Sequence, residues 1–340
     1  RRTKPRASLS HRTFHRRRAI PAGATLLAGG LVCPGASVLA QTAAWPSRPV
    51  RLVVPFAAGG STDVLARLLG AHMAQTWGQP VVIDNKTGAG GVIGADLVAK
   101  SPPDGYTLLL TITSMIQAAA LNPKLPFDPF KDFVAVSQIG YSQSLLLVPA
   151  ALPVKTVGDL VTLSKTGKGL SFASFGTGTS PHLYGELLNM RAGTRLVHVP
   201  YKGASLAIND LISGQVDAVF VDMGSARPQL GTGKVKPLAI TGERRASFLP
   251  DVPTMAESGY PGFEPNGWFG LFAPAGTPAD IVARVTAEAA RIVKLPEVAE
   301  RFAALGVTPL GSTPDQFAAM LRADAPKWAR IVREANIRVE

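Results

Sequence analysis

The sequence predicts an α/β protein of the doubly wound type, and three observations lead to this fold class. Apolar runs such as Val50–Val54 and Tyr106–Ile112 are almost continuous, as in the strands of a parallel sheet covered on both faces. Segments with the apolar spacing of helices alternate with these runs. Glycine-rich turns join several strands to the next helix, which is where open α/β sheets bind ligands. With 340 residues, 46% of them apolar, the chain can bury the core of one bilobed unit or of two domains.

The first 40 residues have the order of parts that an export signal has. Eight basic and no acidic side chains accompany an apolar segment from Ala19 to about Cys33 and a cleavage site that ends at Ala40. Most of the net charge of +12 therefore belongs to the leader, which argues against a nucleic-acid-binding surface. Arg16–Arg18 leaves both general secretion and twin-arginine export open. Because the chain starts with Arg1, we expect the true start to lie upstream.

Cysteine use restricts the chemistry of the exported part. Cys33 is the only cysteine and lies in the leader, so disulfides, thiolate metal sites and cysteine nucleophiles are excluded. No later apolar run reaches the length of a membrane span. We therefore expect a soluble periplasmic protein that needs no cofactor and no metal.

From Trp45 onward, short apolar runs predict strands, and a hydroxyl residue, a glycine or a proline marks the start of each predicted helix. The strands are expected at Val50–Val54, Val81–Asp84, Tyr106–Ile112, Val134–Ile139, Leu145–Val148, Leu170–Phe175, Leu196–Val199, Val216–Val221, Pro237–Thr241 and Phe269–Ala273. The helices are expected to begin near Thr62, Gly91, Thr156, Pro181, Ala204, Ser225, Pro278 and Pro314.

Two of the glycine-rich turns offer the chemistry of an anion site. Residues 55–63 read PFAAGGSTD and residues 175–182 read FGTGTSPH, and each stretch ends an apolar strand and opens a helix. Unpaired N–H groups and the positive end of the helix dipole meet at such turns. The first turn alone is better explained as a capped turn without a ligand. The two turns together predict two lobes that each supply half of one anion site.

Other functional readings are weaker. The turn Gly88–Gly94 lacks the third glycine of a dinucleotide fingerprint, and Gly231–Lys234 lacks the hydroxyl of a phosphate-binding loop. No nucleophile elbow occurs, and His72, His182 and His198 have no metal-ligand spacing. The enzymatic alternative that stays open is an exported enzyme for an anionic metabolite, with His182 and Asp222 as its acid–base pair.

From Trp45 to about Ile337 the chain resembles the Bug receptors, the TctC-like solute-binding proteins of tripartite tricarboxylate transporters. The motifs that carry the resemblance are PFAAGGSTD at 55–63, GAGG at 88–91, PPDGY at 102–106, PYKG at 200–203, FLPDVPT at 248–254 and WFGLFAPAGTP at 268–278. It implies a two-lobed, type II-like periplasmic binding protein in which each lobe is a mostly parallel sheet flanked by helices. The lobes would close by hinge motion on the solute. Lobe 1 would comprise 45–144 and 270–340, and lobe 2 would comprise 145–269.

The resemblance also implies a ligand and partners. The ligand would be a small organic anion, a carboxylate, held mainly by main-chain N–H groups and hydroxyls. The partners would be membrane transporter subunits, with the receptor itself a monomer, and a receptor that signals to a sensor kinase is the further alternative. The implied ligand-binding residues are Phe56, Gly60, Ser61, Thr62, Asp63, Ser114, Gly176, Thr177, Gly178, Thr179, Ser180, His182, Tyr201, Lys202 and Asp222. For Lys202, an exposed lysine without a ligand is an equally good reading.

Where relatives of this kind carry small residues and histidine, this chain has Thr113–Gln117 instead. Met115 and Ile116 in that segment predict a more apolar wall of the ligand site.

Overall fold

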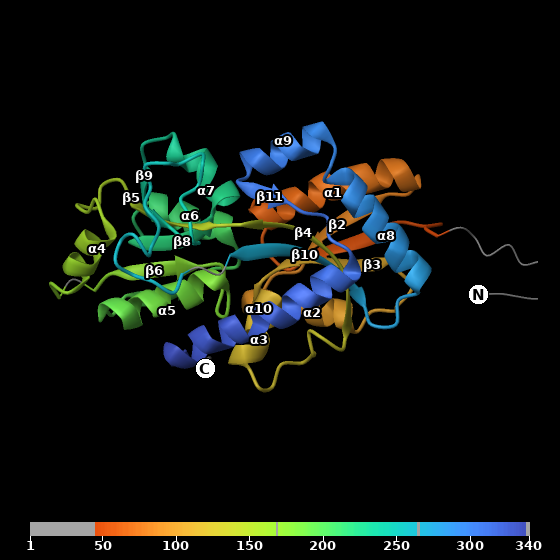
Figure 1. Cartoon of the computed structure of the whole chain (residues 1–340), viewed down its shortest axis with the longest axis horizontal. Helices are drawn as coiled ribbons and strands as arrows, with labels where there is room; N and C mark the ends of the chain where they lie inside the picture. Colours follow the sequence, from red (N-terminus) through yellow and green to blue (C-terminus); the bar gives the residue numbers. More distant parts are fainter. Residues whose placement is uncertain (1–44, 168, 264–265, 338–340) are drawn as a thin grey trace, which may run out of the picture. The chain divides into compact units, whose positions relative to one another are not determined.

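The computed structural model describes residues 45–167, 169–263 and 266–337, so the predicted leader lies outside the described residues. The strands are β1 (Val50–Val54), β2 (Val81–Asn85), β3 (Thr107–Ile112), β4 (Phe133–Ser142), β5 (Ser144–Pro149), β6 (Ser171–Ser174), β7 (Val197–Pro200), β8 (Ala218–Asp222), β9 (Val235–Ile240), β10 (Gly267–Pro274) and β11 (Val307–Pro309) (Figure 1). The helices are α1 (Ser61–Trp77), η1 (Ala89–Gly91), α2 (Val92–Ala99), α3 (Ser114–Leu121), α4 (Val157–Ser164), α5 (Ser180–Ala192), α6 (Ala204–Ile212), α7 (Met223–Leu230), α8 (Ala279–Ile292), α9 (Pro296–Ala304) and α10 (Pro314–Glu334).

The strands form two sheets. The first has the order β11-β4-β10-β3-β1-β2, in which β1 pairs in parallel with β2 and β3, whereas β10 pairs antiparallel with β3 and β4. The second has the order β7-β6-β8-β5-β9, in which β6 pairs in parallel with β7 and β8, whereas β5 pairs antiparallel with β8 and β9. The predicted two-lobed α/β fold is thereby confirmed.

The expectation that both sheets are mostly parallel is wrong, because both are mixed. The prediction rested on the continuous apolar runs, and such runs report burial on both faces rather than the direction of the neighbouring strand. Strand β5 is buried along Ser144–Val148 although both of its neighbours run antiparallel to it.

Two hydrophobic clusters fill the space on the two faces of the sheets. In the first, Leu65 and Leu69 of α1 pack with Leu52 and Val285, and the same cluster continues to Val219 in the second sheet. The second cluster joins α2, α3 and α10 on the first sheet to α4 and α5 on the second. In β3, β5 and β8, alternate residues belong to different clusters, as the two-residue period of a strand requires. Each cluster therefore runs through both lobes.

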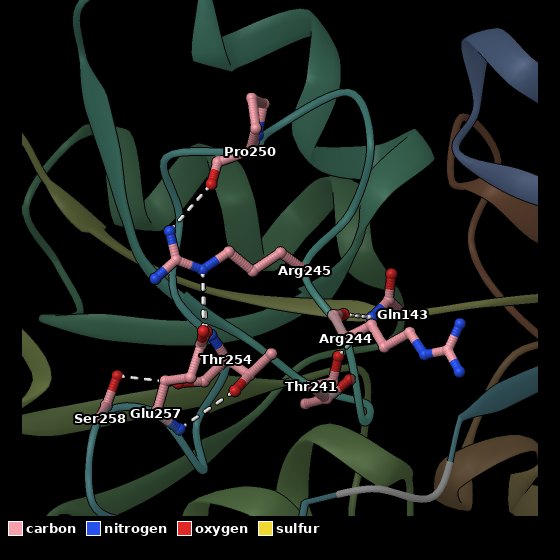
Figure 2. A network of polar contacts seen from close by, with 8 residues as sticks. All are labelled: Gln143, Thr241, Arg244, Arg245, Pro250, Thr254, Glu257 and Ser258. Carbon is pink, nitrogen blue, oxygen red and sulfur yellow. Dashed lines mark hydrogen bonds and ion pairs between the residues drawn. The ribbon is translucent and has the colours of Figure 1, made fainter.

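The chain crosses between the sheets at two places, and the Gln143 side chain connects these two crossovers. Gln143 alone separates β4 from β5, and the chain returns to β10 through residues 241–266. The Gln143 side-chain amide donates to the carbonyl oxygens of Thr241 and Arg244, both at 2.7 Å (Figure 2). The Arg245 guanidinium in turn pairs with Glu257 at 2.9 Å, which folds the return segment on itself. The predicted limits of the two lobes stay a prediction.

Helix α10 contacts both lobes. It packs on β4 and α3 of the first lobe, and its last turns lie beside α5, as Figure 1 shows near the C label. The Trp328 ring lies 5.6 Å from that of Tyr184, and Arg191 of α5 pairs with Glu334 at 3.3 Å. Among the described residues, no helix combines the length and the apolar character that a membrane span requires.

Candidate functional site

A small cavity lies where the ends of strands from both sheets meet the first turns of α1 and α5. Its volume is about 40 Å³. Hydroxyl groups make up most of its polar wall, and Asp222 is the only ionisable residue among the lining residues that the structure describes. The lining consists of Thr62, Ile112, Thr113, Ser142, Ser144, Phe175, Ser180, Pro181, Asp222, Gly267, Trp268 and Phe269.

The first turn brings the N-terminus of α1 to this cavity. Gly60 is the N-cap residue and provides no side-chain cap. The Ser61 N–H donates to Ser225 Oγ of the second lobe at 3.3 Å, whereas no protein acceptor is found among the described residues for the Thr62 N–H. A free N–H group at the positive end of a helix is a donor suited to an anion. Thr62 thus offers both an N–H group and a hydroxyl.

Asp63, which the sequence assigns to the ligand site, points into its own lobe. Its carboxylate accepts hydrogen bonds from the Gly59 N–H at 3.0 Å, from Arg67 at 2.9 Å and from Asn85 at 3.0 Å. Burial disfavours the charged form, but the hydrogen bonds from Arg67, Gly59 and Asn85 outweigh it and lower the pKa of Asp63. Asp63 is therefore an ionised support of the first turn.

Hydrogen bonds of the Thr179 and His182 side chains stabilise the second turn, Gly176–Ser180. Thr179 Oγ1 donates to the Gly176 carbonyl at 2.7 Å, and the Gly178 N–H donates to His182 Nδ1 at 3.1 Å. Ser180 Oγ accepts a hydrogen bond of 2.9 Å from Gln117 of the first lobe, so its own proton is available for another acceptor. Only Ser180 of this turn lines the small cavity.

His182 and His198 form a stacked pair beneath the second turn. Their ring centroids are 4.0 Å apart, and His198 Nε2 lies 2.7 Å from Ser174 Oγ. Burial lowers the pKa of His182 to about 4, and burial together with the neighbouring His182 lowers the pKa of His198 to about 3. Both rings are therefore neutral at neutral pH, and they stabilise the second turn.

Asp222 ends β8 and joins the two lobes. Its carboxylate caps α7 by accepting the Ser225 N–H at 3.0 Å, and it also accepts a hydrogen bond from the Ser61 hydroxyl of the first lobe. Burial raises the pKa of Asp222, although the hydrogen bonds from Ser61 and Ser225 oppose that shift. In the described residues no hydrogen bond joins His182 to Asp222, since each is engaged elsewhere.

A second pocket of about 230 Å³ lies between the lobes, beyond Phe175, which lines both spaces. Its wall includes Gly176, Thr177, Tyr201 and Lys202. The Tyr201 hydroxyl donates to Asp210 at 2.7 Å, and burial together with this hydrogen bond raises the pKa of Tyr201 to about 12. The Lys202 carbonyl oxygen accepts the Ala57 N–H at 3.0 Å, so its main chain links the lobes. Lys202 itself is exposed.

Five further residues of the sequence-based set lie beside the cavity rather than in its wall. Gly60 faces Ala204 of the second lobe, and Gly178 and Thr179 form the back of the second turn. Phe56 is 5% exposed and packs against Gly91. Ser114, the remaining member, is buried at the start of α3 near the same glycine. Met115 and Ile116 lie in the hydrophobic core and are not among the residues that line the small cavity, and the apolar wall expected from them stays a prediction.

Sequence reasoning missed several wall residues. Thr113 follows β3 directly and accepts the Trp268 N–H at 2.9 Å, while Ser142 and Ser144 flank the crossover. The available signal was a hydroxyl at the end of each of these apolar strands, next to the place where the chain changes sheets. In the described residues no cluster of His, Cys, Asp and Glu could hold a metal ion.

The chain thus has the architecture of two-lobed α/β proteins in which a polar cavity lies between the lobes. The first turns of helices face this cavity. The family model described as "Tripartite tricarboxylate transporter family receptor" (TctC) matches residues 65–337. The chain belongs to this family.

Relatives and solved structures of the family are similar over nearly the whole described chain. BugT of Bordetella pertussis is 37% identical over 94% of this chain and 97% of its own length. The structure of Rpa4515 of R. palustris with adipate is 35% identical, covers 86% of this chain and 99% of that one, and has a TM-score of 0.83. MatC of Rhodopseudomonas palustris, with bound malate, is 38% identical, covers 84% and 99%, and has a TM-score of 0.81.

Proposed function

We propose that this chain is a periplasmic receptor that captures a small organic carboxylate between its lobes and delivers it to a tripartite tricarboxylate-type membrane transporter. The observation that carries the proposal is the convergence of two helix N-termini, one from each lobe, on the cavity that Thr62 and Ser180 line. The lining residues that the structure describes include no lysine and no arginine. Dipoles, N–H groups and hydroxyls would therefore hold the anion. Adipate and malate, bound by two solved relatives, support a carboxylate ligand.

The size of the cavity suggests how a ligand would be held. A cavity needs a volume of about 10–15 Å³ to hold one water molecule. The volume of about 40 Å³ therefore suits one carboxyl group rather than a whole dicarboxylate. The remainder of a longer ligand would need the neighbouring pocket of 230 Å³ beyond Phe175. Contacts such as Ser61 with Asp222 and Gln117 with Ser180 close the cavity, so the lobes would separate for entry.

A thermal-shift screen of the purified protein tests the proposal. A panel of mono-, di- and tricarboxylates that includes malate and adipate is compared with sugars, amines and metal salts. A binder should raise the unfolding midpoint in a saturable manner and leave the ligand chemically unchanged. Mass spectrometry of the denatured protein shows whether a co-purified ligand already occupies the site. If every carboxylate leaves the midpoint unmoved and a sugar or a cation raises it, the proposal is wrong.

A further inference from the structure

Asp222 places a carboxylate of the protein in the cavity proposed for a carboxylate ligand. One of its oxygens accepts hydrogen bonds from the Ser61 hydroxyl and from the Ser225 N–H. The other oxygen accepts the Ser225 hydroxyl, at 3.0 Å. A carboxylate oxygen has about two acceptor positions, so this second oxygen has capacity for one more partner. Because Asp222 lines the cavity, the proposed ligand would be placed to be that partner.

The positive charge at the site does not balance two carboxylates. Helices α1, with 17 residues, and α5, with 13, each present an N-terminus, which is equivalent to roughly half a positive charge. The N-terminus of α7, which Asp222 caps, adds a comparable partial charge. A ligand carboxylate added to ionised Asp222 would therefore leave part of a negative charge uncompensated in a space of about 40 Å³.

The ionisable groups on the surrounding elements do not supply the missing charge. On α1, Arg67 forms a bidentate ion pair with Asp63. On α5, His182 is neutral and accepts the Gly178 N–H. On α7, Arg227 donates to the carbonyl oxygens at the end of α9. Lys202, after β7, lines the neighbouring pocket rather than this one.

We propose that Asp222 holds the ligand in its protonated form, so that each carboxylate ligand is bound together with one proton from solvent. The inference rests on the proposed function and adds the protonation state of Asp222 in the ligand-bound protein. The protonated oxygen donates to the ligand carboxylate, while the other oxygen keeps its bonds to Ser61 and Ser225. Burial, which already raises the pKa of Asp222, favours this state, and a second carboxylate nearby raises it further. Ligands whose ammonium group would approach Asp222 should bind less well.

The test is calorimetric titration with malate and with adipate from about pH 6.5 to about pH 9, where both ligands are ionised. Binding enthalpies measured in buffers of different ionisation enthalpy give the number of protons taken up. We expect uptake that approaches one proton per ligand. Above the pKa of free Asp222, Kd should rise by up to about tenfold per pH unit.

Asp222→Asn is the decisive variant, because an amide mimics the protonated carboxyl. Its oxygen can accept from Ser61 and Ser225, and its NH2 group can donate to the ligand. The variant should bind malate or adipate with an unchanged or lower Kd at high pH, with no pH dependence and no proton uptake. Asp217→Asn is the matched control. Asp217 lies next to the other end of β8 and accepts the Ser171 N–H at 2.8 Å and the Ser171 hydroxyl at 3.0 Å. This control should keep the proton uptake of the unmodified protein.

Two results would overturn the inference while leaving the proposed function intact. One is carboxylate binding without proton uptake and with a constant Kd over the whole pH range. The other is loss of binding in Asp222→Asn at every pH while its unfolding midpoint is unchanged, which would show that binding requires the ionised carboxylate of Asp222. If neither protein binds any carboxylate at any pH, the proposed function and the inference both fail.

Discussion

Asp63 and Asp222 show how hydrogen-bond partners set the role of a carboxylate. Asp63 is 2% exposed, yet three donors of its own lobe hold its charge and lower its pKa. Asp222 has only hydroxyl and N–H partners, without a basic side chain, and burial raises its pKa. The same residue type thus supports a turn in one place and faces the ligand cavity in the other.

Thr62→Val should weaken carboxylate binding while preserving the shape of the side chain. The hydroxyl of Thr62 lines the cavity next to a free N–H group. A hydrogen bond to a charged group contributes about 1.5–3 kcal/mol, so Kd should rise by roughly 10- to 100-fold. Calorimetry with the best ligand of the thermal-shift panel measures the change.

Thr162→Val is the control for this substitution. Its hydroxyl is exposed on α4 and bonds the Gly158 carbonyl at 2.9 Å. Equal effects of the two variants on Kd would show that Thr62 acts through general stability rather than through the ligand.

The stacked histidines predict a pH dependence of stability. In the folded chain the pKa values of His182 and His198 are about 4 and about 3, against 6.5 for a free histidine. The unfolded chain therefore binds more protons below pH 6.5, and stability falls as the pH drops. The stabilisation is complete above pH 6.5, and for His182 it amounts to roughly 3 kcal/mol, lost progressively towards pH 4.

Urea unfolding between about pH 4 and about pH 8 measures this dependence. His198→Phe removes one of the two titrating rings and should reduce the slope below pH 6.5. A free energy of unfolding that stays constant from pH 6.5 down to about pH 4.5 would contradict the assignment of neutral, buried rings.

At the scale of elements, two glycine turns face each other across the lobes. Gly90, with φ of 63°, lies so close to the second turn that a Cβ atom there would come within 2.2 Å of the Thr177 carbonyl oxygen. A Cβ atom at Gly176 would likewise lie 3.0 Å from the Gly90 Cα. These main chains can meet only without side chains, so we expect the contact to set how far the lobes close.

Gly90→Ala should therefore prevent full closure. We expect at least a tenfold increase in Kd and a larger radius of gyration with ligand bound, measured by calorimetry and by small-angle scattering. The local backbone also becomes strained, by about 1 kcal/mol, because φ is positive.

Gly78→Ala separates closure from backbone strain. Gly78 has φ of 65° and ψ of 15°, close to the values of 63° and 20° at Gly90, and a Cβ atom there would meet nothing within 4 Å. Both variants should lose similar stability, but only Gly90→Ala should lose affinity. Equal affinities would show that the contact does not limit closure.

Sequence patterns predicted the positions of helices and strands better than the residues that line the cavity. The helices after Gly60 and Thr179 begin where capping and Pro181 predict them. Helix α3 was missed although Thr113 and Ser114 are residue types that favour a helix start, and β11, a strand of three residues, was missed because it is too short for a pattern. Whether Ser61 and Asp222 approach each other depends on the packing of the lobes, which spacing along the chain does not encode.

At the scale of the whole molecule, Gln143 links the two crossovers about which lobe motion would occur. Gln143→Ala removes two hydrogen bonds of 2.7 Å to the return segment. We expect a looser hinge, a shift of the free protein towards open forms and a several-fold change in Kd. Single-molecule energy transfer between dyes on the two lobes measures the shift.

Gln215→Ala serves as the control, because Gln215 is exposed and its side chain makes no described hydrogen bond. An unchanged distance distribution in Gln143→Ala would show that the crossovers are held by their main chains, for example by the Ser144 N–H that donates to Thr241 Oγ1.

The hydrophobic clusters that run through both lobes have a consequence for how the chain unfolds and is degraded. If Leu65 and Val219 belong to one continuous core, neither lobe retains a complete interior once the other melts. Denaturation should then be a single cooperative event. A protease would find the two lobes either both folded or both unfolded, and a solute that bridges them would protect the peptide bonds of both lobes together.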